Sequence, residues 1–290
     1  MIAHVAAAGE ARGRVVLRVC GAGPSAVALA AAVHVARAYQ SQLESVFIRD
    51  EHVLAMASHP FTKVISPSGR SVKHWRPADI DREYRAIERK VAQHLSQLAT
   101  PYDVPLHSRV VSDDPLRALT AACAEAGPWN VIALAEPVGG YAFDQLAAIL
   151  SNVRDATGLV LAGRNAVRTE GPVVIVVDDV ASISGAIRAG SRLAETAGQP
   201  LLVLPAGADD PETDTLEGHL RLALADASED TSAEIVVTGA LHGSPDAMAE
   251  VVRRLRPGFV IARLGGALIP DPDALRSVIG ALEGPLFLVR

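Results

Sequence analysis

The sequence has few cysteines and few aromatic residues, and it lacks a long apolar run. Cys20 and Cys123 are the only cysteines among 290 residues, too few for a CxxC metal site or a disulfide framework. No stretch approaches the roughly 18 uncharged apolar residues that a membrane-spanning helix needs. The first 14 residues have a short apolar start without a basic segment, unlike a signal peptide. We therefore expect a cytoplasmic protein without a membrane segment.

Positive charge is scarce as well. The net charge is −6 at pH 7, which argues against a nucleic-acid partner because such proteins present a basic surface. Hydrophobic residues make up 49% of the chain and charged residues 21%, a balance typical of a folded chain with a sizeable core. The nine histidines show no HxH or HExxH spacing, so we expect no metal site.

The chain contains one pattern twice. The first strand and turn of each copy align so that Val19 matches Val177 and Cys20 matches Asp178, a shift of 158 positions. The ends of the copies agree at a shift of 126, where Gly139-Gly140, Gly158 and Arg164 recur as Gly265-Gly266, Gly284 and Arg290. The difference of 32 residues indicates an insertion in the first copy. We place domain 1 at residues 1–165 and domain 2 at residues 171–290.

Each copy alternates short apolar strands with helices. The expected strands are 14–19, 43–49, 105–111, 130–135 and 158–163, then 172–177, 200–205, 233–238, 258–262 and 285–289. Apolar residues recur at helical spacing between them, as in Tyr84, Ile87, Val91, Leu95 and Leu98. The strands are mostly apolar, as in strands covered on both faces. This order predicts an α/β class with two doubly wound domains in tandem, each built on a five-stranded parallel sheet.

The insertion covers about residues 50–79. From His52 to Ala78 it contains no Asp or Glu, and proline and glycine interrupt regular structure. It is either a solvated excursion or a segment that docks an anion or an acidic partner, with Phe61 as an apolar anchor. The residues assigned to this role are Lys63, Arg70, Lys73, Trp75 and Arg76.

The order of elements resembles the universal stress protein family in its tandem two-domain form. The segments that carry the resemblance are "VVIVVDD", "PLLVLP" and "GPLFLVR" in the second copy and "VVSDDPLRALTAACAEAGPWNVIALAEP" in the first. The resemblance covers nearly the whole chain outside the first residues and the insertion. It implies an adenine nucleotide α-hydrolase-like fold with strand order 3-2-1-4-5 in each domain. It also implies two domains that pack face to face as an intrachain pseudo-dimer, and a homodimer of chains stays open.

Family members that bind ATP carry Gly-x-x-Gly after the fourth strand, followed about nine residues later by Gly-Ser or Gly-Thr, so that the backbone wraps the phosphates. In this chain the glycines are adjacent in both copies, as Gly139-Gly140 and Gly265-Gly266, and no such pair follows at that distance. Asp271 and Asp273 would repel a phosphate in the second copy. The resemblance therefore implies a degenerate nucleotide site.

The acid that the family places after its first strand survives only as Asp178, where Cys20 stands in the first copy. Asp178 would either contact a nucleoside or cap the following helix. Cys20 is either a reactive thiol near a helix start or a small buried hydrophobe. Binding of ATP or AMP would therefore depend on the second copy, through Asp178 and the glycine pair after its fourth strand.

The turn Gly21-Ala22-Gly23, followed by Ala26, also matches a dinucleotide-binding fingerprint, with Asp50 or Glu51 as the ribose-binding acid. The matching turn of the second copy, "VDDVASISGA", makes the same connection without these glycines, which favours a structural role.

Three functions remain. The first is a non-catalytic stress-response or regulatory protein without a cofactor, which acts through contacts with another protein. The second is an ATP- or AMP-binding switch that uses the second domain. The third is a dinucleotide-binding protein that uses the Gly21–Gly23 turn. We expect no enzyme, because no catalytic constellation is found and Ser25 lacks the flanking glycines of a nucleophile elbow.

Overall fold

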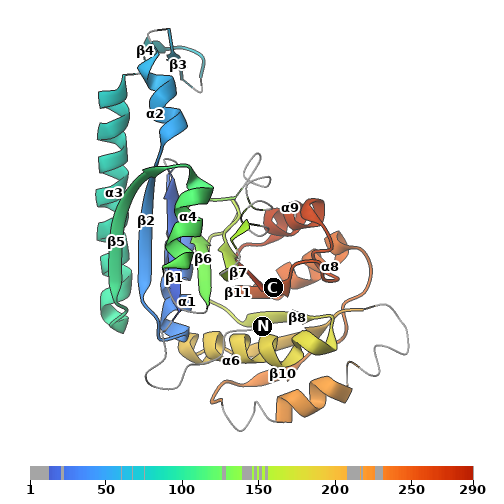
Figure 1. Cartoon of the computed structure of the whole chain (residues 1–290). Helices are drawn as coiled ribbons and strands as arrows, with labels where there is room; N and C mark the ends of the chain where they lie inside the picture. The colour runs from blue at the N-terminus through green and yellow to red at the C-terminus, as the bar shows by residue number, and fades with distance from the viewer. Residues whose placement is uncertain are drawn as a thin grey trace.

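The chain folds into an α/β structure in which helices cover both faces of one large, mostly parallel sheet (Figure 1). This computed structural model describes residues 13–20, 23–59, 61–66, 68–74, 76–125, 129–138, 146, 149, 152–153, 156–207, 216, 218–225 and 231–289. Residues with a predicted role that lie outside this set are Gly21, Trp75, Gly139 and Gly140, and the side chain of Lys73 is also outside it. The predicted α/β class is confirmed.

The strands and helices fall close to the positions predicted from the repeat. The first half contains β1 (Arg14–Cys20), α1 (Ala26–Ala38), β2 (Leu43–Asp50), α2 (Glu51–Ser58), β3 (Lys63–Ile65), β4 (Val72–His74), α3 (Pro77–Ala99), β5 (Leu106–Asp113), α4 (Pro115–Ala124), β6 (Asn130–Leu134) and β7 (Ala156–Leu161). The second half contains β8 (Val173–Val177), α6 (Ile183–Ala197), β9 (Leu201–Pro205), β10 (Ile235–Val237), α8 (Pro245–Arg254), β11 (Phe259–Arg263), α9 (Pro272–Ala281) and β12 (Leu286–Val289).

Polar side chains begin several of these helices. The Asp114 carboxylate accepts from the backbone N–H groups of Leu116 and Arg117, and Pro115 occupies the first turn of α4, as the sequence predicts. Ser25 begins α1 in the same way, because its hydroxyl accepts from the N–H of Ala28. Ser25 therefore has a local structural role in the turn after β1.

The strand order along the sheet is β10-β9-β8-β11-β12-β7-β6-β1-β2-β5. Within each half this is the predicted order 3-2-1-4-5, and the strand pairs of this large sheet inside each half are all parallel. The predicted face-to-face packing is wrong, because the halves join edge to edge. The fifth strands β7 and β12 pair in antiparallel register, with Leu159 opposite Leu288. Each fifth strand would otherwise leave its N–H and C=O groups unpaired at a sheet edge.

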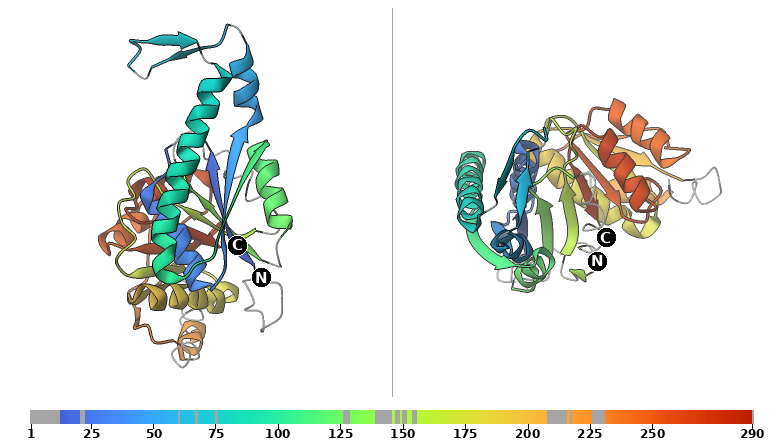
Figure 2. Two further views of the ribbon diagram at one scale, coloured as in Figure 1. Left: turned by 90° about the vertical axis from the view of Figure 1, so that its left-hand side faces the viewer. Right: turned by 90° about the horizontal axis from the view of Figure 1, so that it is seen from above.

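Two layers of helices enclose the sheet, as the two views in Figure 2 show. Buried residues of α1, α3 and α6 form one apolar cluster with one face of the sheet, and those of α4, α8 and α9 form the other. Helix α1 also reaches the second half. The ring of His34 lies 6.1 Å from that of Phe259, and the ring of Tyr39 lies 6.5 Å from that of Phe287. The halves therefore share a core as well as a sheet.

The insertion is more regular than the sequence predicts. It forms α2, the antiparallel hairpin β3–β4 and the first turn of α3, and this part stands well away from the sheet (Figures 1 and 2). We call residues 51–76 the arm. Asp50 begins α2 by accepting from the N–H of His52, so the carboxylate considered as a ribose ligand caps a helix. Proline and glycine lie in the connections of the arm and do not prevent its short elements.

Candidate functional site

Open α/β sheets bind ligands beyond the carboxyl ends of their strands, where the strand order reverses. In this chain the reversal lies between β1 and β6 in the first half and between β8 and β11 in the second. The residue after the first strand and the loop after the fourth strand meet at each place. These two switch points are the candidate nucleotide sites, and their side chains decide what they can hold.

At the switch point of the second half, Asp178 is committed to neighbours in the chain. Its side chain is only 7% exposed, and one oxygen lies 3.2 Å from Nε of Arg263 at the end of β11. Its other oxygen accepts from the backbone N–H of Ala267. The cap considered for Asp178 is made by its neighbour Asp179, which accepts from the N–H of Ala181. Asp178 therefore ties the first strand to the loop after the fourth.

The glycine pair of this loop fits that arrangement. Gly265 has φ +78, a left-handed conformation that favours glycine. A Cβ at Gly266 would lie 2.0 Å from Oδ2 of Asp178. Glycine is thus required at position 266 by the close approach of the carboxylate. The structure brings these predicted residues together, and their contacts are with one another.

The switch point of the first half contains the same kind of pair with the charges exchanged. Here the acid is Glu136, just beyond β6, and the base is Arg18 in β1, with 3.8 Å between Oε2 and the guanidinium. Glu136 also accepts from the backbone N–H of Cys20. The Arg18 and Glu136 side chains are 7% and 11% exposed. In both halves, an ion pair and a hydrogen bond to backbone N–H therefore bridge the first and fourth strands.

Burial governs the ionisation of this first site. It raises the pKa of the Glu136 carboxyl to about 7, although the Arg18 guanidinium and the Cys20 N–H both favour the charged form. Burial also raises the pKa of the Cys20 thiol to about 12. A thiol with such a pKa stays protonated at neutral pH, which favours a small, partly buried residue over a reactive nucleophile at Cys20.

Other residues that the sequence places at the candidate sites have local roles. Asp271 caps α9 by accepting from the N–H of Ala274 at 2.8 Å, and Asp273 pairs with Arg276 one turn further on. Gly23 is not needed for close backbone approach, since a Cβ there would meet nothing within 4 Å. With Gly21 outside the described residues, the dinucleotide turn stays a prediction, without steric support at Gly23.

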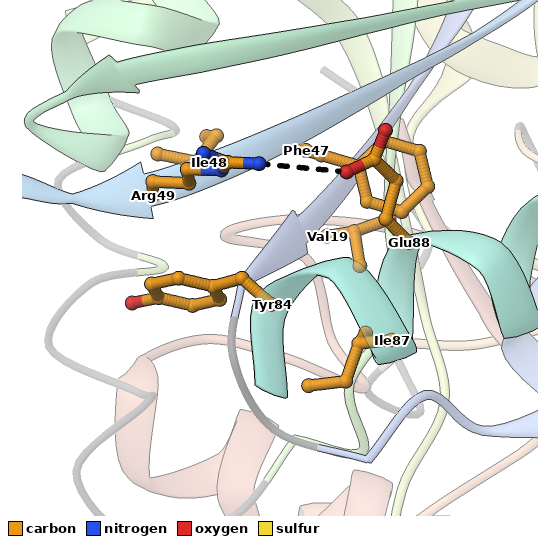
Figure 3. A pocket seen from close by; sticks show the side chains of 7 residues that line it. All are labelled: Val19, Phe47, Ile48, Arg49, Tyr84, Ile87 and Glu88. Carbon is orange, nitrogen blue, oxygen red and sulfur yellow. Dashed lines mark ion pairs between the residues drawn. The ribbon is translucent and has the colours of Figure 1, made fainter. Parts of the chain in front are cut away.

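A small pocket lies beside the first switch point, under α3. It is lined by Val19, Phe47, Ile48, Arg49, Tyr84, Ile87 and Glu88 (Figure 3). Its cavity volume is about 10 Å³, room for about one water molecule, whereas ligand pockets commonly hold about 300–1,000 Å³. Arg49 crosses its rim to reach Glu88 at 3.7 Å and Asp81 at 3.0 Å. These ion pairs fasten the start of α3, and thus the root of the arm, to β2.

The residues assigned to docking lie on the arm. Lys63 and His74 face each other across the hairpin, and Arg70 lies in the connection between its strands. Arg76 directly precedes α3 and is exposed, as are Lys63 and Arg70. The sequence did not single out Arg18, Glu136 or Arg263, because an exchanged ion pair leaves no shared motif in the two copies. Charged residues inside or next to otherwise apolar strands were the available signal.

The described residues bring together no group of three or more His, Cys, Asp or Glu side chains with metal-binding geometry. Within the same part of the chain, every helix is too short or too polar to cross a membrane.

Comparisons with known proteins define the fold. No family model matches the chain. A universal stress protein from Archaeoglobus fulgidus DSM 4304 superposes with a TM-score of 0.59 at 12% identity, over 95% of this chain and 96% of that one. A protein assigned to the universal stress proteins of Pseudomonas aeruginosa UCBPP-PA14 gives 0.54 at 14% identity, over 95% and 92%. The predicted resemblance is confirmed at the level of the fold.

Two further likenesses show why fold and function are separate questions. The cytoplasmic domain of a prokaryotic cation chloride cotransporter superposes with a TM-score of 0.54 at 10% identity, over 96% of this chain and 95% of that one. A 3-deoxy-manno-octulosonate cytidylyltransferase from Anaeromyxobacter sp. (strain K) is 32% identical over 104 residues, which is 33% of this chain. The chain matches 41% of the length of that relative.

Proposed function

We propose that this chain is a universal stress protein of the tandem form, a non-catalytic regulator that acts in the cytoplasm through contacts with other proteins. The observation that carries the proposal is the use of both switch points for internal ion pairs. Where a nucleotide would need free donors and acceptors, Asp178 is held by Arg263, and Glu136 by Arg18. A regulator without a working nucleotide site must transmit its effect through its surface, and the arm is its most distinctive surface.

A nucleotide would have to break these pairs before it could bind. Removing one partner of a buried ion pair leaves an uncompensated charge, which commonly costs about 3–5 kcal/mol. Asp178 also places an acidic group at the second candidate site, where it would oppose the phosphates of ATP. We therefore infer that ATP, ADP and AMP bind weakly or not at all.

Calorimetric titration of the full chain with ATP, ADP and AMP, each with Mg²⁺, tests the proposal. We expect no saturable heat. A micromolar Kd for ATP would contradict a degenerate site, and the variant Asp178→Ala then decides between locations. Loss of ATP binding in that variant would support the switch that uses the second half. Unchanged binding would place the nucleotide elsewhere in the chain.

The partial match to a cytidylyltransferase defines a second candidate, because that relative is an enzyme. Transfer of a cytidylyl group from CTP releases pyrophosphate, which a coupled assay detects. We expect no pyrophosphate from CTP and 3-deoxy-manno-octulosonate in the presence of this chain, with a cytidylyltransferase as positive control. Pyrophosphate release that depends on both substrates would overturn the non-catalytic assignment.

A further inference from the structure

We propose that the arm is a dimer contact, in which the basic hairpin β3–β4 docks on the β10 edge of a second copy of this chain. The β10 edge of the first copy receives the arm of the second. The inference rests on the proposed function only in treating the arm as a contact surface, and it names the partner that the arm fits.

The hairpin presents an apolar and basic face to solvent. Ile65 pairs with Val72 and Lys63 pairs with His74, so these four side chains share one face of the two strands. Ile65 is 65% exposed and Val72 57%, and Phe61, just before the hairpin, is 88% exposed. Apolar side chains gathered in this way on a projection are typical of a surface that a partner covers.

The arm is held in place rather than loosely attached. Helices α2 and α3 contact each other, and Ala57 of α2 and Ile80 of α3 are buried, at 3% and 2% exposure. At its root, Arg49 of β2 pairs with Asp81 and Glu88 of α3. A contact surface that is already ordered loses less conformational entropy when it binds.

The chemistry of the hairpin favours a protein over a lipid surface. Its strands are joined by a polar connection in which Ser66 bonds to the hydroxyl of Ser68 and to the N–H of Ser71. Segments that lie in a membrane interface keep their apolar and charged side chains on opposite faces, whereas Lys63 and His74 here share the face of Ile65 and Val72. Here the apolar pair Ile65 and Val72 lies on the side of the hairpin, where the surface of another protein can cover it.

Charge identifies a second copy as the fitting partner. The stretch from His52 to Ala78 contains four basic residues and no acid, whereas the whole chain has a net charge of −6. The residues outside this stretch therefore carry −10. A basic projection on a strongly acidic body is complementary to another copy of that body, which steers association and fixes its orientation.

The β10 edge is the part of that body with matching features. In the described sheet β10 pairs only with β9, so its other edge is open. Val236 and Val237 are 37% and 48% exposed there, and the exposed Glu234 directly precedes the strand. An open edge with exposed apolar side chains and an exposed acid directly beside it invites an extended basic segment.

The arm and β10 lie at opposite ends of one molecule, as Figure 1 and the left view of Figure 2 both show. The arm therefore cannot cover the β10 edge of its own chain. Two copies related by a two-fold axis can place each arm on the other copy's edge at the same time. Both contacts are then satisfied, and the assembly closes at two chains.

Analytical ultracentrifugation of charge-reversed full-length chains tests the inference. The arm variant carries Lys63→Glu and Arg70→Glu, and the edge variant carries Glu234→Lys and Val236→Lys. We expect the wild type to be a dimer, and each variant alone to dissociate with a Kd raised about tenfold or more. An equimolar mixture of the two variants should recover the dimer, because every arm then meets an edge of opposite charge.

A matched control carries Arg89→Glu and Lys90→Glu, which make the same charge change on the exposed side of α3 outside the arm. It should dimerise as the wild type does. Circular dichroism melting curves show whether each variant is folded. A monomeric wild type, or an arm variant that dimerises normally, would overturn the inference. If neither variant dimerises alone and their mixture also stays monomeric, β10 is not the docking site.

These results are separable from the nucleotide titrations. A monomeric wild type that binds no ATP would contradict the dimer but would agree with the proposed regulatory function. A dimeric wild type that binds ATP at micromolar Kd would support the dimer and contradict the degenerate site.

Discussion

Leu159 in β7 lies directly opposite Leu288 in β12, and this antiparallel pair marks the seam where the two halves become one sheet. Both side chains are buried, at 1% exposure each. One residue away, Gly158 faces Val289, and a Cβ at Gly158 would lie 2.4 Å from Cε2 of the buried Phe287. The seam therefore depends on a glycine on one strand and an aromatic ring on the other.

We predict that Gly158→Ala destabilises the whole chain, since the added methyl group overpacks the seam. The expected loss is about 1–3 kcal/mol in the free energy of unfolding, measured by urea denaturation. Gly280→Ala in α9 is the matched control, because a Cβ there meets nothing within 4 Å. Equal stability of the two variants would show that the seam tolerates the methyl group.

The sequence was sufficient to predict the strands because each is a short apolar run that recurs in a second copy. The strand order followed from the family resemblance and is confirmed. The seam could not be predicted, since an apolar strand covered on both faces has the same sequence pattern whether its edge pairs with another strand or stays open. The hairpin was missed because three-residue strands such as Lys63–Ile65 are too short to show a period.

The candidate sites show a second limit of prediction from the sequence. The residue after the first strand is Cys20 in one copy and Asp178 in the other, which sequence alone reads as loss and retention of an acid. The structure shows that each half has an acid at its switch point, supplied by different strands. Alignment by position cannot find a pair whose members have exchanged places.

Stability should depend on pH through Glu136. Its folded-state pKa is raised to about 7 from its ordinary value of 4.5, so the folded chain binds the proton more tightly than the unfolded chain does. By linkage, the tighter binding of this proton stabilises the folded chain. The stabilisation is complete below pH 4.5 and is lost as the pH rises through 7. The change appears as the difference between wild type and Glu136→Gln in melting temperature, measured from pH 4.5 to 8.

The Gln variant keeps an acceptor for the N–H of Cys20 and removes the titration. Wild type should lose stability relative to it as the pH rises across this window. A difference that stays constant with pH would show that Glu136 ionises normally in the folded chain.

A double-mutant cycle should detect the pair between Asp178 and Arg263. Asp178→Ala also removes the acceptor of the Ala267 N–H, so it should cost more than Arg263→Ala. We expect a coupling energy of about 1–2 kcal/mol from urea unfolding of the two single variants and the double variant. Coupling within about 0.3 kcal/mol of zero would mean that the two side chains act independently.

Cys20 should react slowly with thiol reagents in the folded chain. Its thiol pKa of about 12 leaves almost no thiolate at pH 8, and Cys123 is buried. Titration with an aromatic disulfide reagent should therefore be slow for native protein and rapid, with two thiols per chain, in denaturant. Fast reaction of one thiol in the native chain, lost in Cys20→Ser, would make Cys20 an exposed nucleophile.

Deletion of the hairpin, residues 60–75, should leave the rest of the chain folded. It spares α2 and α3, which contact each other and bury Ala57 and Ile80. With a short glycine-serine linker in place of the hairpin, α2 and α3 keep their contacts. We expect the melting temperature to stay within a few degrees of wild type, whereas a collapse would make the hairpin part of the stabilising core.

The antiparallel seam also affects the nascent chain during translation. Strand β7 ends at Leu161, but its partner β12 begins only at Leu286, after the whole second half has been made. Ribosomes add roughly 5–20 residues per second, so the edge of β7 stays uncovered for on the order of ten seconds. An open apolar edge can pair with a neighbouring chain on the same polysome. The seam that joins the two halves thus leaves the β7 edge exposed while the second half is synthesised. A chaperone that binds strand edges during this period would raise the yield of folded chains.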